Sequence, residues 1–307
     1  MKAKIKQSLL KFNTLRRIVQ FLSFIFFSAM IFNIVPQPLL LPVVWTWGFQ
    51  SNIVGDAFTA MQLMFYDTVF PWLALASFLI TGILVGKSLC GWVCPFGFIQ
   101  DLIDLVKRKK TEISPRTHES MLYIKYAILG IAFFISVTFS AAKVVGVHRG
   151  YEGAFGIFVK MPFTTVSPAE TLFSTLPNGV LNFKNALLEK SLLDVLSGIA
   201  GFPPLLWVQL FILGSVLVFA AYVPRSWCKY FCPHGAIMAI LNRFSFLGLK
   251  RDLTKCAKAE CRQCVEVCPM RVRILDLPWE KFSDPECIYC LKCVDSCPNN
   301  AIKLKYP

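Results

Sequence analysis

The sequence predicts a mainly α-helical membrane protein: a four-helix transmembrane domain of two parallel two-span repeats, followed by a small α+β domain. Three observations lead to this fold class. Hydrophobic residues make up 55% of the 307-residue chain and charged residues only 16%, which is too apolar for an ordinary soluble protein. Four apolar segments have the length of membrane-spanning helices. All twelve cysteines lie in ordered motifs, eight of them between residues 256 and 297.

The apolar segments run near Ile18–Val35, Val69–Val85, Tyr126–Ala142 and Leu205–Val223. A helix that crosses a bilayer needs about 20 predominantly apolar residues, and each segment comes close to that length. A basic stretch precedes the first segment, as in a signal peptide. No small-residue cleavage site follows it, so we interpret the segment as an uncleaved span. We therefore expect a membrane domain over residues 1–246 and a cytoplasmic cysteine-rich domain over residues 247–307.

The basic residues predict the orientation of these spans. Six of them precede the first span with no acidic residue among them: Lys2, Lys4, Lys6, Lys11, Arg16 and Arg17. The second connection carries the basic run Lys107–Lys110, whereas Pro36–Thr68 has no Lys or Arg. By the positive-inside rule we expect a multi-pass protein of the cytoplasmic (inner) membrane with both termini in the cytoplasm.

The net charge of +14 has an explanation in the same topology. Basic residues on the cytoplasmic side determine orientation and contact anionic membrane lipid. No nucleic-acid recognition module accompanies the charge, so we predict no nucleic-acid partner.

The two predicted halves carry the same motif. Ser88–Gly97 reads SLCGWVCPFG, and Ser226–Gly235 reads SWCKYFCPHG. Each motif follows an apolar segment and precedes an amphipathic one, Phe98–Lys107 or Ala236–Phe244, which we expect along the cytoplasmic interface. Because both halves begin in the cytoplasm, the repeats are parallel and their C-x3-C-P motifs face each other at one depth.

These motifs supply the four cysteines Cys90, Cys94, Cys228 and Cys232. Two cysteines four residues apart on a helix share a face, and the repeat axis brings the two pairs together. Four thiolates suit a third [4Fe–4S] cluster or copper. They also suit a pair of redox dithiols. Simple packing is the remaining alternative, since free cysteines are often buried. The sequence leaves all of these uses open.

The C-terminal cysteines form two runs, Cys256–Cys268 and Cys287–Cys297. The second run is C-x2-C-x2-C-x3-C-P, the spacing that holds [4Fe–4S] clusters in two-cluster ferredoxins. In such proteins the fourth cysteine of each run crosses to the other cluster. The predicted ligand sets are therefore Cys256, Cys261, Cys264 and Cys297 for one cluster, and Cys287, Cys290, Cys293 and Cys268 for the other.

Cytoplasmic thiols stay reduced, which favours metal binding over disulfides for these cysteines. Two zinc sites are the alternative. The first run departs from the usual pattern, because C-x4-C replaces C-x2-C between Cys256 and Cys261. The tail is short and would need its clusters in order to fold.

The three histidines are weaker candidates. We interpret His118 as a surface residue and His234 as a solvated interfacial side chain, with a metal ligand or proton relay as the alternative for His234. His148 lies beside Arg149 and Glu152, a group that suits either a quinone headgroup or interfacial anchoring. No nucleotide-binding loop or hydrolytic triad is present, so we expect no catalytic residues of the acid–base type.

Four spans, two C-x3-C-P motifs and a dicluster tail resemble the NapH/NosR membrane polyferredoxin family over nearly the whole chain. The length and layout are most similar to its NapH members. The resemblance implies an iron–sulfur electron-transfer subunit. Such a subunit would link the quinone pool to a periplasmic reductase through a partner iron–sulfur or cytochrome protein. It leaves open whether the chain is an enzyme by itself or a quinol-oxidising component of a larger oxidoreductase.

A second hypothesis comes from CcoG, a copper-handling relative that shares the C-x3-C-P motifs. It implies a metal reductase or an assembly factor for a respiratory metalloenzyme. Copper would then be bound by the four motif cysteines.

Overall fold

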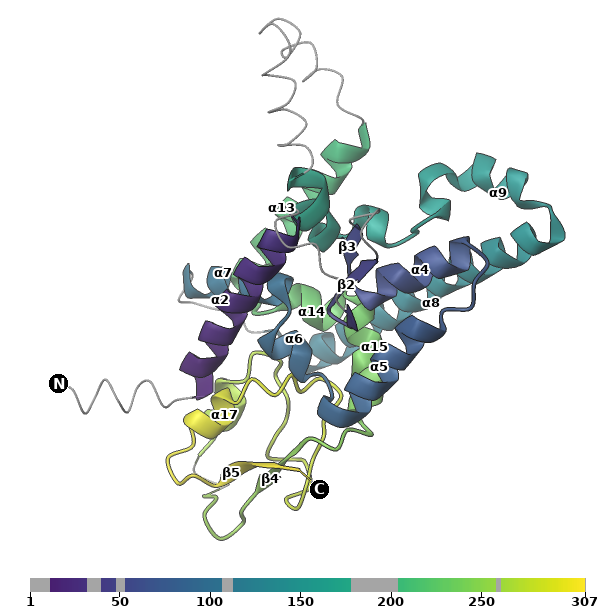
Figure 1. Cartoon of the computed structure of the whole chain (residues 1–307). Coiled ribbons are helices and arrows are strands. Elements are labelled where there is room, and N and C mark those ends of the chain that lie inside the picture. The colour runs from purple at the N-terminus through teal and green to yellow at the C-terminus, as the bar shows by residue number, and fades with distance from the viewer. Residues whose placement is uncertain are drawn as a thin grey trace, which may run out of the picture.

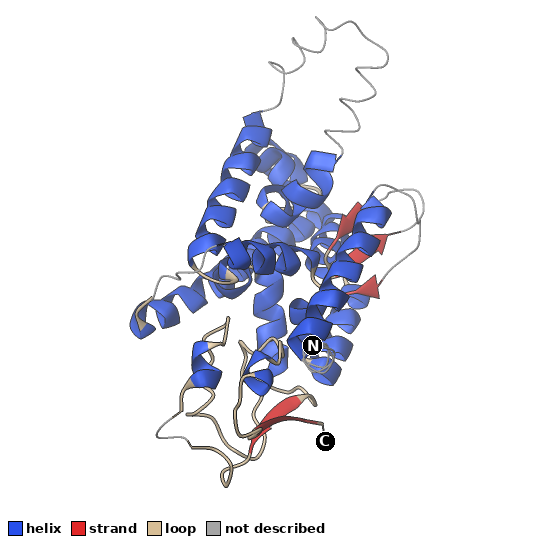
Figure 2. Ribbon diagram, turned by 90° about the vertical axis from the view of Figure 1, so that its left-hand side faces the viewer, coloured by secondary structure: helices blue, strands red, loops and turns tan. Residues whose placement is uncertain are grey.

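The computed structural model describes residues 12–31, 40–47, 53–106, 113–177, 204–257 and 261–306. Helices form an elongated body, and a loop-rich tail with one pair of strands lies at one end of it (Figures 1 and 2). The chain is mostly helical, as predicted.

Among the described residues, the four longest apolar helices are α2 (Phe12–Ile31), α5 (Trp72–Val85), α8 (Pro115–Val145) and α13 (Pro204–Tyr222). Within the described residues, α8 and α13 are long and apolar enough to cross a membrane. Helix α5 has only 14 residues, because it starts after Pro71 and ends at Gly86 with φ 57°. That length rises about 21 Å, less than the roughly 30 Å hydrocarbon core. The predicted four-span layout is therefore not confirmed.

The boundaries of the predicted spans also differ in part. The first helix begins at Phe12, six residues before the predicted start, and Val35 lies outside the described residues. Helix α8 extends beyond the predicted third span at both ends, from the Ser114 cap to Gly146 with φ 82°. Helix α13 agrees with the fourth prediction within one residue at each end.

Shorter elements connect these helices. Three strands form an antiparallel sheet in the order β1 (Leu40–Leu41), β2 (Val44–Trp47) and β3 (Ile53–Gly55). The short helices are α4 (Ala57–Tyr66), α6 (Ser88–Trp92), α7 (Pro95–Val106), α9 (His148–Phe155), η1 (Gly156–Val159), η2 (Thr164–Val166), α10 (Pro168–Glu170), η3 (Thr171–Thr175), α14 (Ser226–Tyr230) and α15 (Pro233–Asn242).

The tail contains two strands and two single-turn helices. Strands β4 (Gly248–Arg251) and β5 (Ile302–Lys305) pair antiparallel, with Leu249 opposite Leu304. Helices α16 (Gln263–Glu266) and α17 (Lys292–Asp295) each contain the third cysteine of a run. The α+β character predicted for the tail is therefore present.

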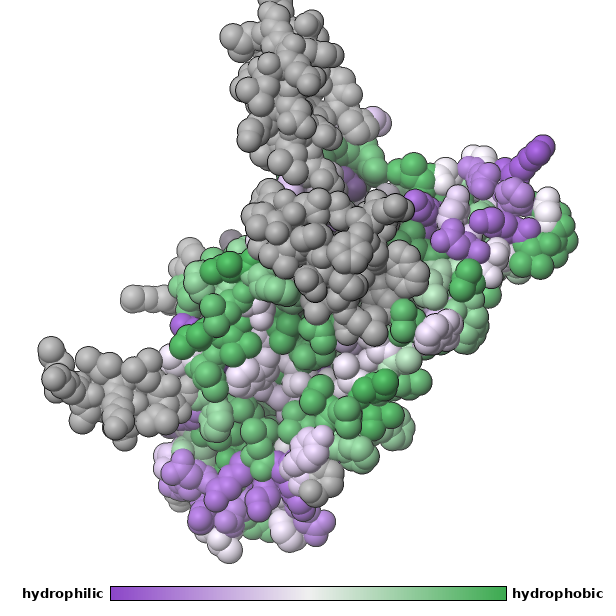
Figure 3. All heavy atoms as spheres, viewed as in Figure 1, coloured by the Kyte–Doolittle hydropathy of each residue, from purple (hydrophilic) through white to green (hydrophobic). Residues whose placement is uncertain are grey.

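Exposed apolar side chains cover the helical body. Phe211 on α13 is 76% exposed and Phe134 on α8 is 68% exposed. In Figure 3 apolar residues dominate the helical body, whereas polar residues gather on the tail. An apolar surface of this kind on a single chain indicates contact with a membrane or another protein.

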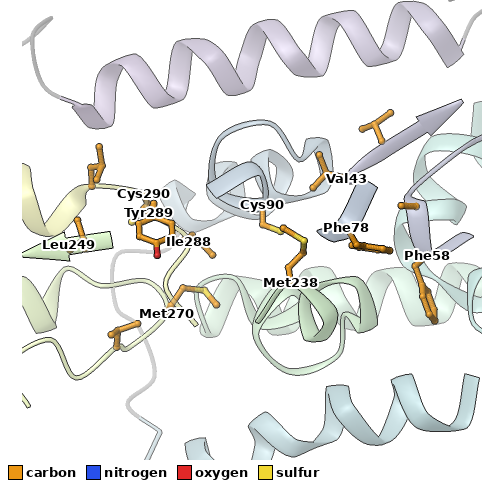
Figure 4. Packing of buried hydrophobic residues seen from close by; sticks show 14 of the residues in the cluster. Val43, Phe58, Phe78, Cys90, Met238, Leu249, Met270, Ile288, Tyr289 and Cys290 are labelled. Carbon is orange, nitrogen blue, oxygen red and sulfur yellow. The ribbon is translucent and has the colours of Figure 1, made fainter. Parts of the chain in front are cut away.

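One hydrophobic core joins the tail to the helices. It runs from Met270 and Ile288 in the tail, through Cys90 and Met238, to Phe58 on α4 (Figure 4). The tail is therefore packed directly on the C-x3-C-P region.

The helix after the second motif is buried more deeply than predicted. Helix α15 lies against α5 and α8, and Ala236, Met238 and Ala239 have no exposed surface. The expected interfacial position of Ala236–Phe244 is therefore wrong for α15. Small residues explain this packing, because they allow helices to approach closely. A Cβ on Gly82 of α5 would lie only 2.7 Å from Leu241.

Candidate redox site

Each C-x3-C-P motif is a short helix, a turn and a second helix. Cys90 lies on α6, which ends at Trp92, and α7 begins at Pro95. The prediction that the two cysteines share one helix is therefore wrong. Proline is favoured at the first position of a helix, where its missing N–H is not needed, so it starts a new helix after each second cysteine. The Sγ of Cys232 caps α15 by accepting a hydrogen bond from the Gly235 N–H at 3.3 Å.

The two motifs repeat in atomic detail. A Cβ on Gly97 would lie 3.1 Å from the Cys90 carbonyl oxygen, and one on Gly235 would lie 3.1 Å from the Cys228 carbonyl oxygen. The glycine at this position lets the second helix pass close over the first cysteine.

The four motif cysteines line one cavity. Its walls are mainly apolar and aromatic, and the ionisable side chains that line it besides the cysteines are Asp56, Lys87, Glu170 and His234. Residues of both connections that we expect on the outer side take part, namely Val43–Val44 and Phe163–Phe173. The structure therefore brings the four cysteines to one space, which residues of these two connections also line.

Burial acts to raise the pKa of all four thiols, but nearby groups reverse the result for Cys90. It raises the pKa of Cys94, Cys228 and Cys232 above that of an ordinary thiol, and neighbouring cysteines raise the first and last further. For Cys90, burial acts in the same direction, but His234, Lys87 and Arg225 outweigh it and lower its pKa. Thiolates in such a space need a compensating cation, so the donor set fits a soft metal or an iron–sulfur cluster.

His234 is buried beside this cavity, so the interpretation as a solvated side chain is wrong. Its side chain is 4% exposed, and its Nδ1 lies 3.4 Å from Asp56 Oδ2. Burial lowers the pKa of His234, but Asp56 and Cys90 raise it to about 9. The sequence could not indicate this pairing, because Asp56 lies in a distant connection.

Two buried cations precede the motifs at equivalent positions, Lys87 and Arg225, and neither is exposed. Arg225 donates two hydrogen bonds to Asp101, at 2.8 and 2.6 Å, and one to the Cys90 carbonyl at 2.9 Å. Arg16 donates to the same carboxylate at 2.8 Å. Two arginines from different helices therefore fix Asp101 on α7 beside the first motif. The sequence analysis did not identify this cluster, although the equivalent positions of Lys87 and Arg225 were a visible signal.

The tail contains a second cavity lined by cysteines. Its cysteines are Cys268, Cys287, Cys290 and Cys293. This grouping is the crossed set that the sequence predicts for one cluster. Burial raises the pKa of Cys268 to about 11, and the charge of Cys290 contributes. Buried sulfur atoms in an apolar pocket are the donor set that an iron–sulfur cluster requires.

The other predicted set is only partly assembled. Burial raises the pKa of Cys264, and the nearby Cys256 and Cys261 raise it further. Cys297 lies after α17, where its Sγ accepts a hydrogen bond from the Ala301 N–H at 3.2 Å. Across the described parts of the chain, no three His, Cys, Asp or Glu side chains already stand in the geometry of a bound metal ion. The thiols would therefore have to turn toward a common centre to bind one.

The tail touches the first motif at the loop that carries Cys290. Trp92 donates a hydrogen bond from Nε1 to the Tyr289 carbonyl at 2.8 Å. Lys87 forms a 3.0 Å ion pair with Glu286, which also pairs with Lys125 of α8. These contacts connect the two cysteine-lined cavities.

The remaining histidines lie elsewhere. His118 is half-buried, with its Nδ1 2.7 Å from the hydroxyl of Tyr230, so its interpretation as a surface residue is wrong. His148 begins α9, which extends away from α6 and α14 in Figure 1 and has no buried residue. The structure does not bring His148 to either cavity.

Comparison with known proteins agrees with this arrangement. A family model described as a 4Fe-4S binding domain matches residues 67–112 and again residues 205–253. Each match contains one C-x3-C-P motif. A second model, described as a 4Fe-4S dicluster domain, matches residues 255–302. No solved structure matches the chain.

Three curated relatives illustrate the similarity. An uncharacterised protein of Methanocaldococcus jannaschii is 25% identical over 76% of this chain and 77% of its own length. The putative electron transport protein YccM of Escherichia coli is 25% identical over 74% of this chain and 53% of its own. The ferredoxin-type protein NapH of Haemophilus influenzae is 24% identical over 87% of this chain and 75% of its own.

The chain is similar to ferredoxin-type proteins of the NapH/NosR type. The resemblance expected from the sequence is thereby confirmed. The two motif matches and the dicluster match together contain all twelve cysteines.

Proposed function

We propose that this protein is a membrane-bound electron-transfer subunit in which electrons pass between the cysteine-rich tail and the four-cysteine cavity. The observation that carries the proposal is the contact between the two sites. The loop with Cys290 packs on the motif that contains Cys90. Ferredoxin-type relatives and iron–sulfur family models support the same type of chemistry.

The proposed tail ligands are the crossed sets: Cys287, Cys290, Cys293 and Cys268, then Cys256, Cys261, Cys264 and Cys297. We call the first set proximal, because it lies against the motifs, and the second set distal. Bound [4Fe–4S] clusters would supply one-electron transfer. The protein's own part is to hold the thiolates, exclude water and set the surrounding charge.

The four motif cysteines are proposed as one joint site. All four line the same cavity, and its apolar walls disfavour uncompensated thiolates. A third [4Fe–4S] cluster is the occupant that best matches a second, repeated 4Fe-4S family match around these residues.

The part of this cavity near Glu170 offers a binding place for a quinone. Its apolar and aromatic lining with a few polar groups is typical of a small-molecule site. Burial raises the pKa of Glu170 to about 7, so this carboxyl group is suited to exchange protons with a quinone. Glu170 lies in a connection that we expect on the outer side of the membrane. A quinone bound beside it would pass its electrons toward a periplasmic partner protein.

We further propose that residues 1–246 form the membrane domain and residues 247–307 a cytoplasmic domain, with both termini in the cytoplasm. The basic segments before α2 and after α7 support this orientation. The exposed apolar surfaces of α8 and α13 support contact with lipid.

Metal analysis of the full-length protein tests the joint site. Anaerobically purified wild-type protein should contain about 12 iron atoms per chain, for three clusters of four. Cys90→Ser and Cys228→Ser should each lower this to about 8, and the double variant should lose no more. Additive losses, or stoichiometric zinc in place of iron, would contradict the proposal.

Copper reduction is the second candidate function. It is favoured by one observation, the convergence of four soft sulfur donors in one cavity. Copper titration at unchanged iron content, together with a quinol-oxidation assay, separates the two functions. Tight copper binding without quinol oxidation would support the metal reductase or assembly factor.

A further inference from the structure

Gly91 and Lys229 occupy equivalent positions in the two motifs, each directly after the first cysteine. Both residues face the tail, although they come from different halves of the membrane region. Gly91 lies against Ile288, within the loop between the ligands Cys287 and Cys290. Lys229 interacts electrostatically with Cys268, the remaining ligand of the same proximal set. The proximal site is therefore placed between the two repeats.

Gly91 provides the closest approach on one side. A Cβ added there would lie 2.2 Å from the Ile288 carbonyl oxygen, a separation that real atoms do not tolerate. The α6 backbone cannot easily retreat, because Gln20 donates to the Gly91 carbonyl at 2.9 Å. Trp92, the next residue, donates to the Tyr289 carbonyl. Only glycine therefore allows this backbone-to-backbone contact.

Lys229 provides a charge on the other side. Its side chain has no exposed surface, and its Nζ has no hydrogen-bond partner among the described residues. The ring centroid of Tyr230 lies 5.5 Å from Nζ. The ionisable groups that face it are Arg271, Cys268, Glu286 and Asp104. A buried cation without a hydrogen bond is costly to keep, so a nearby negative charge is needed to offset it.

We propose that Gly91 and Lys229 are positioning residues for electron transfer: Gly91 docks the segment Ile288–Cys290 as the route into the four-cysteine site, and Lys229 raises the reduction potential of the proximal site. The proposal rests on the proposed function. One electron crosses between the two sites, so that one is oxidised and the other reduced by one electron, with no bond or proton transferred. The two motifs therefore have different roles. Gly91 provides the close contact in the first motif, and Lys229 provides the charge in the second.

The route is tested with the substitution Gly91→Ala in the full-length, iron-loaded protein. Gly214→Ala on α13 is the control, because a Cβ added at Gly214 would have no heavy atom within 4 Å. Iron content should stay at the wild-type value. Electron transfer from the tail to the motif site, followed by rapid-freeze EPR, should slow on the order of tenfold, since misplacement by about 1 Å is enough for such a loss. Hydrogen exchange of the amides at 288–290 should become faster.

Trp92→Phe is the second variant for this route, because it removes the hydrogen bond to Tyr289 without adding volume. It should give a smaller slowing in the same direction. Transfer rates and exchange equal to those of Gly214→Ala, at full iron content, would overturn the role of Gly91. Missing tail iron in the wild-type protein would instead contradict the proposed function.

The charge is tested with Lys229→Met against Lys250→Met, which removes an exposed lysine from β4. An EPR redox titration should show the proximal site becoming harder to reduce in Lys229→Met. A tenfold change in the reduction equilibrium corresponds to about 59 mV for one electron. Lys229→Arg should restore the wild-type potential, which a merely structural role would not require. An unchanged potential in Lys229→Met with full iron would overturn the role of Lys229.

Discussion

Lys87 and Glu286 form a buried ion pair, 3.0 Å from Nζ to Oε2, that joins the first C-x3-C-P motif to the tail. Lys125 of α8 binds the other oxygen of the same carboxylate. Neither lysine side chain is exposed, and Glu286 directly precedes the proposed ligand Cys287. The pair therefore holds the proximal site in place on the helical body.

Glu286→Gln should destabilise this attachment. It leaves two buried lysines without a counter-charge, which costs about 3–5 kcal/mol when one partner of a buried pair is removed. Limited proteolysis and the thermal midpoint of the purified protein measure the effect.

Glu119→Gln is a matched control, because the Glu119–Arg273 pair also joins α8 to the tail but is more than half exposed. It should change stability by less than about 1 kcal/mol. Equal effects of the two substitutions would show that burial of the pair does not matter.

Gly97→Ala and Gly235→Ala should have similar effects, since each Cβ would lie 3.1 Å from an equivalent carbonyl oxygen. We expect about 1–3 kcal/mol of destabilisation for each, typical of overpacking. Gly130→Ala, in open space on α8, should instead stabilise the helix by about 0.5–1 kcal/mol. Denaturant unfolding compares the three, and a stabilised Gly97→Ala would be inconsistent with a close approach.

Asp101→Asn should destabilise the protein by roughly 3–5 kcal/mol, because it leaves the buried Arg225 and Arg16 without their counter-charge. Burial acts to raise the pKa of Asp101, but the two arginines hold it well below its usual range. A depressed pKa gives stability that is present above the unfolded value, about 4, and is lost as the pH falls.

The difference in thermal midpoint between wild-type protein and Asp101→Asn should therefore be constant between about pH 5 and pH 8. It should shrink only at lower pH. A difference that changes within the neutral range would show that another group controls this cluster.

Cys268→Ser should remove the proximal cluster, although Cys268 belongs to the first run in sequence. Iron content should fall by about four atoms, and the EPR signal of the distal cluster should remain. Cys264→Ser should remove the distal cluster in the same way. Loss of the distal signal in Cys268→Ser would reject the crossed assignment.

A reporter fused after Pro307 should be active only if it functions in the cytoplasm. The basic residues before α2 and the lack of Lys or Arg in Pro36–Thr68 lead to this expectation. An active periplasmic reporter at that position would reverse the topology and remove the argument for reduced thiols.

Cysteine spacing and hydropathy were sufficient to predict much of this protein. They predicted the helical class, the α+β tail, the repeated motif and the family, because spacing and apolar length are local properties of the chain. Cys268, Cys287, Cys290 and Cys293 do line one cavity, as the pattern of two-cluster ferredoxins leads one to expect, and their assignment to one cluster stays a prediction.

Other features depended on residues that meet only after folding. The sequence predicted a solvated His234, whereas the structure buries it beside Asp56. A new helix begins at Pro95, so Cys90 and Cys94 do not share one helix face as predicted. The pairing of Lys87 with Glu286 and the contact of Gly91 with Ile288 join segments almost 200 residues apart. Sequence determined which groups could bind metal and carry charge. Tertiary packing decided which of them share a cavity, because burial and proximity arise only when distant segments pack together.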